Sequence, residues 1–400
     1  MMTLPVPSLD VLLADLRELV ECESPSSDLA AVERSADVVA RLGTERLGVA
    51  PERIVVDGVH HLRWRFGSAE PRVLVLAHHD TVWPIGTLAR QPFSVTDGVL
   101  RGPGCFDMLA GLVMAMHAIA ALDDGSGDGA GDGAGDGAGD GSGDGPGDGA
   151  GGRDGVTLLV TGDEELGSAS SRELIEDEAR RCEAVLVLEA SADGGALKTA
   201  RKGTSLYEVD IAGRAAHAGL EPEKGVNATV ELAHQVLVVS GLGDAEAGTT
   251  VTATAATAGI TANTVPAWGR FAVDVRAWSA AEQERVDAAL RALTPVLPGA
   301  EVRVHGGINR APLEESSSLE LFELAQKVAA RLGHPELTGA AVGGASDGNF
   351  TAGVGTPTLD GLGAVGGGAH ADDEHVLVDR LVDRTMLVHG LLKELLGGGS

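Results

Sequence analysis

RVLVLAHHDTV, residues 72–82, is the stretch that decides the fold of this chain. Its apolar run, Val73 to Ala77, stops abruptly at His78-His79-Asp80. A run of Val and Leu bounded by polar residues predicts a strand that is buried on both faces. Residues two apart in an extended chain point the same way, so His78 and Asp80 share one side. A carboxylate beside a histidine can fix the tautomer of a metal-bound imidazole, although a polar strand end with a capping Asp would have the same sequence.

Three further apolar runs end in acidic or histidine-bearing segments. They are Val156–Val160 before Asp163-Glu164-Glu165, Ala184–Leu188 before Glu189, and Thr356–Leu359 before a glycine-rich loop that reaches His370. Ligands of an open parallel sheet bind beyond the carboxyl ends of its strands. One acidic cluster alone could be ordinary surface, but four such strand ends together predict one shared site.

Composition excludes several classes of function. The 400 residues are enough for two domains and a large core. The formal net charge of −29 argues against nucleic-acid binding, which needs basic patches. No apolar stretch reaches the roughly 18–20 residues of a membrane span, so we expect no membrane partner. The N-terminus lacks the basic start of a secretory signal, and the three cysteines have no metal-type spacing, so we expect a cytoplasmic protein.

Residues 123–154 form a low-complexity run in which Asp recurs at every fourth position from Asp124 to Asp148. Small residues separate these charges, so almost nothing in the run can be buried and we expect disorder. A calcium-binding repeat is the alternative. Glycine-rich calcium repeats need an apolar residue in each unit to build a core, and this run has none.

The order of expected elements predicts two domains. Strands and helices between residues 202 and 310 follow the ferredoxin-like order β-α-β-β-α-β. We therefore expect an α/β catalytic domain of residues 1–201 and 311–400, built on a mixed, largely parallel sheet. A smaller α+β domain of residues 202–310 interrupts it, and we expect the last helix of the catalytic domain to cover residues 376–396. His60 and His61 fall in a predicted antiparallel pair, where we expect surface or edge positions.

Five candidate ligands combine imidazole nitrogen with carboxylate oxygen, a set that suits Zn²⁺. They are His78, Asp107, Glu165, Glu189 and His370. Asp107 stands at a predicted helix start and could instead be an N-cap. Five ligands are too many for one four-coordinate zinc with an open position, so we expect two Zn²⁺ ions sharing a carboxylate, with Co²⁺ or Mn²⁺ as possible substitutes. Such a pair polarises a carbonyl and lowers the pKa of water, whose proton Glu164 could accept.

The chain resembles the di-zinc metallopeptidase family that includes glutamate carboxypeptidase, acetylornithine deacetylase, succinyl-diaminopimelate desuccinylase and the aminoacylases. The matching segments follow the expected order over nearly the whole chain: His78-His79-Asp80-Thr81-Val82, Gly102-Pro103-Gly104 with Asp107, Asp163-Glu164-Glu165 with Gly167-Ser168, Glu189, Gly213 to Gly219, and His370. Among these enzymes, glutamate carboxypeptidase has the motifs that are most similar to these segments. One departure is Leu109-Ala110, where the family usually has Lys-Gly.

The resemblance implies a role for each residue of the catalytic domain's site. His78 and Glu189 would bind one zinc, Glu165 and His370 the other, and Asp107 would bridge them. Asp80 would orient His78. Glu164 would act as general base and then as general acid.

The resemblance also implies a zinc-exopeptidase-like fold for the catalytic domain. The inserted domain would be a lid, and it would also form the interface of a homodimer. His217 would stabilise the oxyanion across the dimer. Asn263 and Arg276 would hold the substrate, Arg276 by its carboxylate. From the residues alone, His217 could be an ordinary loop histidine and Arg276 could simply pair with Asp274.

The implied reaction is hydrolysis of an amide bond next to a free carboxylate, with a small peptide or an N-acyl amino acid as the substrate. An acyl- or peptidyl-glutamate fits best. Deacylation of N-acyl amino acids by the same residues is the alternative. A non-catalytic binding protein on the same fold is disfavoured, because no ligand position is lost.

Overall fold

The computed structural model describes residues 7–122 and 152–397. The predictions made for the Asp- and Gly-rich run fall almost entirely outside these residues. The chain divides into two compact units. Unit 1 comprises Met1–Thr199, Ser318–Ala340 and Val354–Ser400, and unit 2 comprises Ala200–Ser317 and Ala341–Gly353. Among the described residues, no helix combines the length and apolar character needed to cross a membrane.

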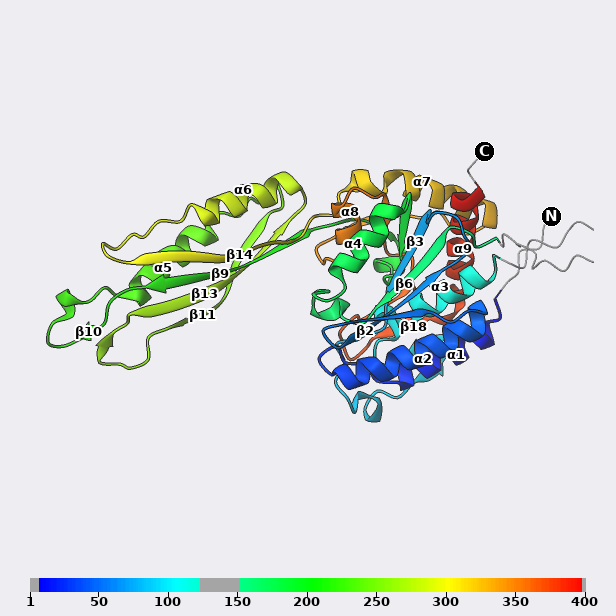
Figure 1. Cartoon of the computed structure of the whole chain (residues 1–400), viewed down its shortest axis with the longest axis horizontal. Helices are drawn as coiled ribbons and strands as arrows, with labels where there is room; N and C mark the ends of the chain where they lie inside the picture. Colours follow the sequence, from blue (N-terminus) through cyan, green and yellow to red (C-terminus); the bar gives the residue numbers. More distant parts are fainter. Residues whose placement is uncertain (1–6, 123–151, 398–400) are drawn as a thin grey trace, which may run out of the picture. The chain divides into compact units, whose positions relative to one another are not determined.

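Unit 1 is built on a six-stranded sheet with the order β1-β2-β6-β3-β7-β16. Its strands are β1 (Glu52–Val56), β2 (Val59–Arg65), β3 (Val73–His78), β6 (Val156–Thr161), β7 (Ala184–Val187) and β16 (Thr358–Leu359). β6, β3, β7 and β16 are parallel, whereas β1 and β2 form the antiparallel edge. This arrangement, visible in Figure 1, confirms the expected mixed, largely parallel sheet.

The central strands are mostly apolar, because helices and other strands exclude water from both of their faces. Every residue of β3, β6 and β7 is buried. Pairing aligns their carboxyl ends: His78 lies opposite Thr161 on β6, and Leu76 lies opposite Val187 on β7. The residues that follow these strands are therefore brought to one edge of the sheet.

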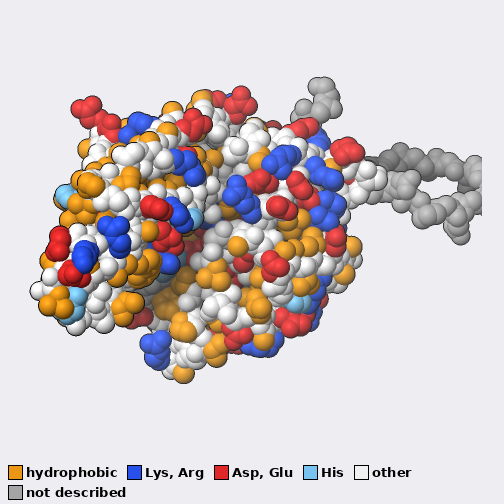
Figure 2. Space-filling view, turned by 60° about the vertical axis from the view of Figure 1, so that its left-hand side comes forward, with side chains coloured by type: hydrophobic (Ala, Val, Ile, Leu, Met, Phe, Trp, Pro, Cys, Tyr) orange, Lys and Arg blue, Asp and Glu red, His pale blue; other side chains and the backbone are white. Residues whose placement is uncertain are grey.

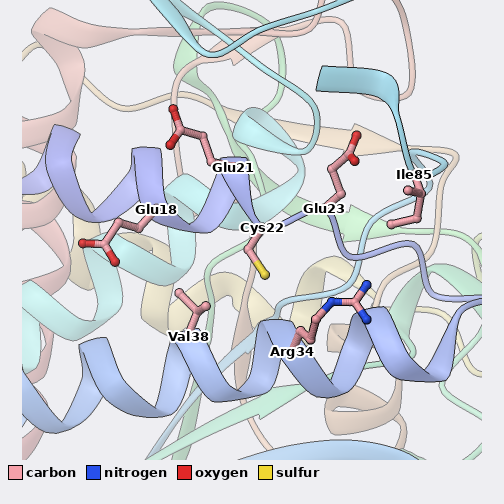
Figure 3. A pocket seen from close by; sticks show the side chains of 7 residues that line it. All are labelled: Glu18, Glu21, Cys22, Glu23, Arg34, Val38 and Ile85. Carbon is pink, nitrogen blue, oxygen red and sulfur yellow. The ribbon is translucent and has the colours of Figure 1, made fainter. Parts of the chain in front are cut away.

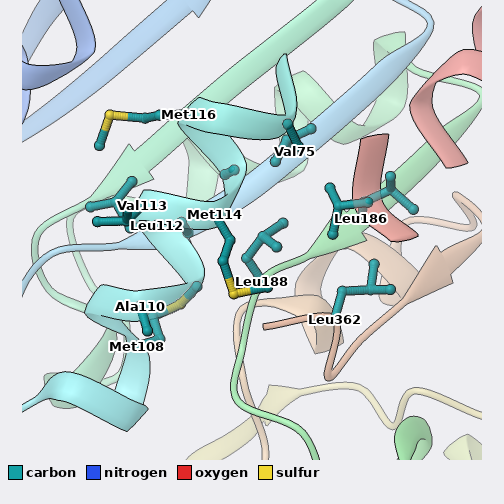
Figure 4. Packing of buried hydrophobic residues seen from close by; sticks show 14 of the residues in the cluster. Val75, Met108, Ala110, Leu112, Val113, Met114, Met116, Leu186, Leu188 and Leu362 are labelled. Atoms are coloured by element: carbon teal, nitrogen blue, oxygen red, sulfur yellow. The ribbon is translucent and has the colours of Figure 1, made fainter. Parts of the chain in front are cut away.

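Helices of unit 1 bury apolar stripes against the sheet and against one another. They are α1 (Leu9–Glu21), α2 (Leu29–Leu47), α3 (Ala110–Ala120), α4 (Arg172–Arg181), α7 (Glu315–Leu332) and α9 (Leu381–Gly397). The carboxylate of Asp28 caps α2 by accepting the N–H groups of Ala30 and Ala31. α3 is apolar on nearly all sides and correspondingly buried, and Figure 4 shows its Met114 beside Leu188.

Small sheets complete unit 1 and its connections. They contain β4 (Ser94–Thr96), β5 (Val99–Arg101), β17 (Gly366–Gly367) and β18 (His375–Leu377) in one sheet, and β8 (Leu197–Arg201) with β15 (Gly339–Val342) in another. β18 corrects one expectation, because the sequence predicted a single helix from residue 376 to 396. The strand forms because β18 pairs with β5, and the helix begins only at Leu381.

Unit 2 has the expected ferredoxin-like order, β9-α5-β11-β13-α6-β14. The elements are β9 (Gly203–Ala212), β10 (Ala216–His217), α5 (Ala228–Ser240), β11 (Thr250–Ala258), β12 (Thr264–Val265), β13 (Trp268–Ala277), α6 (Ala280–Arg291), β14 (Glu301–Arg310) and α8 (Gly348–Gly353). The antiparallel sheet runs β11-β13-β9-β14. Its alternating buried residues, such as Val209, Phe271 and Val273, form a core separate from that of unit 1.

Charged side chains of both signs lie on the face of the molecule that Figure 2 shows. In Figure 2, the side chains of Lys and Arg are interspersed with those of Asp and Glu over the visible surface. Many are neighbours on a helix, such as Arg285 with Glu282 and Arg291 with Asp287. Exposed pairs of this kind contribute little to stability.

Candidate metal centre

The five candidate ligands of unit 1 converge on one edge of its sheet. His78 is the last residue of β3, Glu165 lies in a short helical turn just after β6, and Glu189 follows β7. Asp107 precedes α3, and His370 lies in the loop between β17 and β18. Parallel pairing of the strands brings His78, Glu165 and Glu189 together. Asp107 and His370 reach the site on loops.

His78 is the buried centre of the first group. Its Nε2 atom lies 3.5 Å from Glu189 Oε1 and 3.7 Å from Asp107 Oδ1. These distances exceed those of good hydrogen bonds, and Nε2 is a buried atom without a hydrogen-bond partner. A buried polar atom without a partner is costly, so its position among carboxylate oxygens fits a metal ligand.

His370 is the centre of the second group. Its Nε2 atom lies 3.1 Å from Glu165 Oε2 and 3.4 Å from Asp107 Oδ2. Asp107 therefore turns one oxygen toward His78 and the other toward His370. It is not the N-cap of α3, because that position is occupied by Leu109, two residues later.

Glu164 lies on the side of the first group. One oxygen of its carboxylate, one of Glu189 and one nitrogen of His78 all lie within 4.8 Å of one another, as do ligand atoms of His78, Asp107 and Glu165. Glu164 itself is buried. Adjacent residues 164 and 165 thus direct their carboxylates to different parts of the same cluster.

The carboxylate of Asp80 contacts the loop after β6 as well as His78. It accepts the backbone N–H groups of Glu164 and Glu165, at 3.2 and 3.1 Å, and the hydroxyl of Ser26 at 2.6 Å. Nδ1 of His78 lies 3.0 Å from the carbonyl oxygen of Asp80 and 3.4 Å from its carboxylate. The backbone of Asp80 thus orients His78 more closely than its side chain does, and the side chain fixes the Glu164-Glu165 turn.

The electrostatics of the cluster favour cations. Burial lowers the pKa of His78, but the carboxylates of Asp107, Asp80 and Glu189 raise it well above its ordinary value. Hydrogen bonds with Asp107 and Glu165 raise the pKa of His370 to about 10. Burial acts to raise the pKa of Asp107, yet the two histidines hold it well below its usual range. The same negative potential that retains protons on the imidazoles would favour a divalent cation in their place.

The donor set therefore fits two metal ions. Each group offers one imidazole nitrogen and one carboxylate, and both groups share Asp107. Nitrogen and oxygen ligands of this kind suit Zn²⁺. A carboxylate with one oxygen toward each group has the disposition needed to bridge two ions.

The other candidate residues belong to unit 2 and fall into two places there. His217 on β10 lies opposite Thr264 on β12, and the N–H of Ala218 donates to the carbonyl of Asn263 at 3.0 Å. His217 and Asn263 are thus neighbours. Arg276 instead lies opposite Thr204, at the start of β9.

Arg276 pairs with Asp274, which was the alternative to a role in binding the substrate. Its Nε and Nη2 atoms donate to the two oxygens of Asp274, at 2.8 and 2.9 Å, and Nη1 donates to Thr204 Oγ1 at 2.9 Å. About a third of the side chain is exposed. Three of its five N–H groups are engaged, which leaves two for a further acceptor.

One expectation about histidines was wrong. His61 is fully buried on β2, which is an inner strand of the sheet, where its Nδ1 atom accepts the N–H of Gly162 and its Nε2 atom lies 3.2 Å from Ser170 Oγ. The Ser170 hydroxyl in turn donates to Asp163 at 2.7 Å. The alternating pattern of the strand predicted its pairing but not these polar partners, which come from the loop after β6.

A separate surface hollow lies between α1 and α2 and contains none of the candidate ligands. Its lining residues are Glu18, Glu21, Cys22, Glu23, Arg34, Val38 and Ile85 (Figure 3). The carboxylate of Glu23 accepts the N–H groups of Gly86 and Leu88, at 2.8 and 2.9 Å, and so supports a loop. Burial raises the pKa of Cys22, which keeps its thiol protonated.

Comparison with known proteins agrees with this geometry. The model of peptidase family M20/M25/M40 matches residues 74–132 and 149–394. Carboxypeptidase G2 of Pseudomonas sp. (strain RS-16) is 31% identical over 344 residues, which are 83% of this chain and 76% of that protein. Succinyl-diaminopimelate desuccinylase of Anaplasma marginale (strain Florida) is 38% identical over 71 residues, which are 17% of this chain and 19% of that protein.

Solved structures share the fold over almost the full length. The M20 family metallo-carboxypeptidase Sso-CP2 from Sulfolobus solfataricus superposes with a TM-score of 0.71 at 16% identity, covering 96% of this chain and 99% of that one. YXEP from Bacillus subtilis, described as a dinuclear metal-binding peptidase, gives 0.63 at 15% identity, covering 97% and 98%. The family match spans most of the chain and includes the converging ligands. This protein therefore belongs to the peptidase family M20/M25/M40 and is a peptidase or amidohydrolase.

Proposed function

We propose that this protein is a di-zinc hydrolase that cleaves an amide bond next to a free carboxylate, as a glutamate carboxypeptidase does. One observation carries the metal part of the proposal: the two oxygens of Asp107 face two separate imidazole–carboxylate pairs. His78 and Glu189 would hold one ion, His370 and Glu165 the other, and Asp107 both. When bound, the two ions supply Lewis acidity that lowers the pKa of water and polarises the scissile carbonyl.

Glu164 is the residue proposed to move the proton. Its carboxylate is buried beside the first group, and its backbone N–H is fixed by Asp80. A fixed carboxylate at this place can accept a proton from the attacking water and donate it to the leaving amine. Burial and the Asp80 hydrogen bond limit the movement of Glu164, which keeps the proton acceptor in reach of the reacting atoms.

The substrate class rests on the relatives and on Arg276. Carboxypeptidase G2 is similar over most of this chain, and a guanidinium with two N–H groups still to donate is suited to a carboxylate. We propose an acyl- or peptidyl-glutamate. The shorter similarity to succinyl-diaminopimelate desuccinylase supports a second candidate, deacylation of an N-acyl amino acid.

We further propose that two chains complete each site. Arg276 lies opposite Thr204, at one end of β9. His217 lies beyond Ala212, at the other end of the same strand. Eight residues of extended strand span roughly 25 Å, so a small substrate cannot contact both side chains of one chain. If Arg276 holds the substrate carboxylate, His217 reaches the same substrate only from a second copy, as expected for a homodimer formed by unit 2.

Metal analysis and a substrate panel test the proposal. Purified protein should contain two zinc ions per chain, lose activity with a chelator and regain it with Zn²⁺. In the panel, an acyl-glutamate should be hydrolysed much faster than the same compound with its α-carboxylate masked as an amide. Full activity with a single tightly held metal would contradict the shared-ligand site, and equal rates on both substrates would contradict the carboxypeptidase assignment.

A further inference from the structure

Glu374 is a buried carboxylate that accepts four hydrogen bonds. Its Oε1 atom accepts the backbone N–H groups of Phe106 and Asp107, at 2.9 and 3.1 Å. Its Oε2 atom accepts the N–H of Gly104 at 2.9 Å and the indole N–H of Trp83 at 2.7 Å. Only 4% of the residue is exposed. Two carboxylate oxygens offer about four acceptor sites, so these donors satisfy the group completely.

The donors and Glu374 come from three segments of the chain that carry candidate ligands. Gly104 to Asp107 form the turn that presents the shared carboxylate. Trp83 follows β3, the strand that ends at His78. Glu374 itself stands four residues after His370 in the loop between β17 and β18. One side chain thus joins the turn of Asp107 to the loop of His370.

These contacts do not describe a metal ligand. Both oxygens of Glu374 are directed at N–H donors, and three of the donors are backbone groups next to or within the Asp107 turn. Burying a carboxylate in this position costs desolvation free energy. Its hydrogen bonds offset that cost only while all of them are made. The arrangement holds backbone in place rather than offering an open coordination position.

We propose that Glu374 is the positioning residue that sets the distance between Asp107 and His370, and so forms the half of the metal centre that contains Glu165. This inference rests on the proposed di-metal function. Without Glu374, the backbone N–H of Asp107 would lose its acceptor, and the loop of His370 would lose its attachment to the turn. In the other half, His78 and Glu189 stand at strand ends and would keep their positions, so that half would lose only the support of the shared Asp107.

The test compares Glu374→Gln with Asp373→Asn. Gln has the same shape, but its amide nitrogen cannot accept a hydrogen bond, so two of the four N–H donors lose their acceptor. Asp373 is an exposed neighbour in the same loop, and its substitution removes the same charge. Stepwise titration of metal-free protein with Co²⁺, followed by visible absorption and by calorimetry, measures the two binding steps separately from activity.

We expect Asp373→Asn to bind two Co²⁺ ions, each with the affinity that wild type shows for the same step. Glu374→Gln should bind the second ion about 10–100-fold more weakly, the usual effect of losing a partner that orients a ligand. Its first ion should be weakened much less, because His78 and Glu189 stay in place. With excess Zn²⁺, its KM should stay near wild type while kcat falls. A purely structural role would lower the melting temperature without separating the two binding steps.

Two equal, wild-type binding steps in Glu374→Gln would overturn the positioning role. If Glu374→Gln does not fold, Glu374→Asp keeps the charge but withdraws the carboxylate by one methylene, and wild-type binding of both ions by that variant would overturn it equally. Failure of the underlying function looks different: wild type itself would then bind fewer than two Co²⁺ ions.

Discussion

Glu164 and Glu165 are joined by one peptide bond, yet the proposed chemistry gives them different tasks. Glu165 lies 3.1 Å from His370, and Glu164 lies with His78 and Glu189. Glu164→Gln should therefore keep both metal ions and lose about 10²–10⁴-fold in kcat, because an amide cannot accept the proton. Metal content and turnover should be measured on the same preparation.

Glu165→Gln is the matched control for this prediction, because it makes the same chemical change one residue away. It should lose metal affinity at the His370 half. The Asp80 hydrogen bonds to the backbone of both residues stay in place in both variants. If Glu164→Gln loses metal and Glu165→Gln keeps it, the two roles are interchanged.

At the scale of elements, Asp15 joins three helices. Its carboxylate on α1 accepts two hydrogen bonds from Arg46 on α2, at 2.7 and 2.8 Å, and lies 2.8 Å from His117 Nε2 on α3. Burial acts to raise the pKa of Asp15, but these partners together lower it to about 2. The ionised form is thus favoured in the folded state, and the resulting stability is present above pH 4 and disappears as the pH falls toward 2.

Asp15→Asn should destabilise the protein by about 1–2 kcal/mol above pH 4, with a difference that narrows between pH 4 and pH 2. Urea unfolding of both proteins at several pH values measures this difference. Asp10→Asn, on the first turn of α1, is the control and should show little change. A constant difference down to pH 2 would mean that packing, rather than charge, accounts for the loss.

The strands that carry three of the candidate ligands could be predicted, because each has a recognisable pattern in its own short stretch of sequence. The apolar runs before His78, Glu165 and Glu189 identify buried strands, and parallel pairing brings their ends together. The partners of His61 and Glu374 could not be predicted, because they are mostly backbone N–H groups or hydroxyls distant in sequence. Gly104 and Glu374 are 270 positions apart, and no residue type marks a backbone donor. The strand at residues 375–377 was missed for the same reason, since its partner β5 defines it.

For the whole molecule, the separation of His217 from Arg276 predicts sharing of residues between two chains. His217→Ala and Glu164→Gln should each be nearly inactive. When the two are mixed and allowed to exchange subunits, half of the dimers are mixed, and each mixed dimer contains one site with all its groups. Activity should return to about a quarter of the wild-type value.

Mixing each variant with itself is the control and should restore nothing. If His217 acts on the site of its own chain, a mixed dimer has no complete site, and the mixture stays inactive. Size-exclusion chromatography of the mixture shows whether dimers form at all, so the absence of activity can be assigned to one cause.

Unit 1 is made from the two ends of the chain, with unit 2 between them, and this has a consequence for biosynthesis. Four of the ligands, His78, Asp107, Glu165 and Glu189, leave the ribosome before unit 2, whereas His370 and Glu374 follow it. At ~5–20 residues per second, the roughly 180 residues between Glu189 and His370 take about 10–35 s to make. During that interval the nascent protein has every proposed ligand of the first ion, but the second ion still lacks His370. Loading of the second metal therefore has to wait until the His370 loop has been made, and it depends on whatever metal the cell has available at that moment.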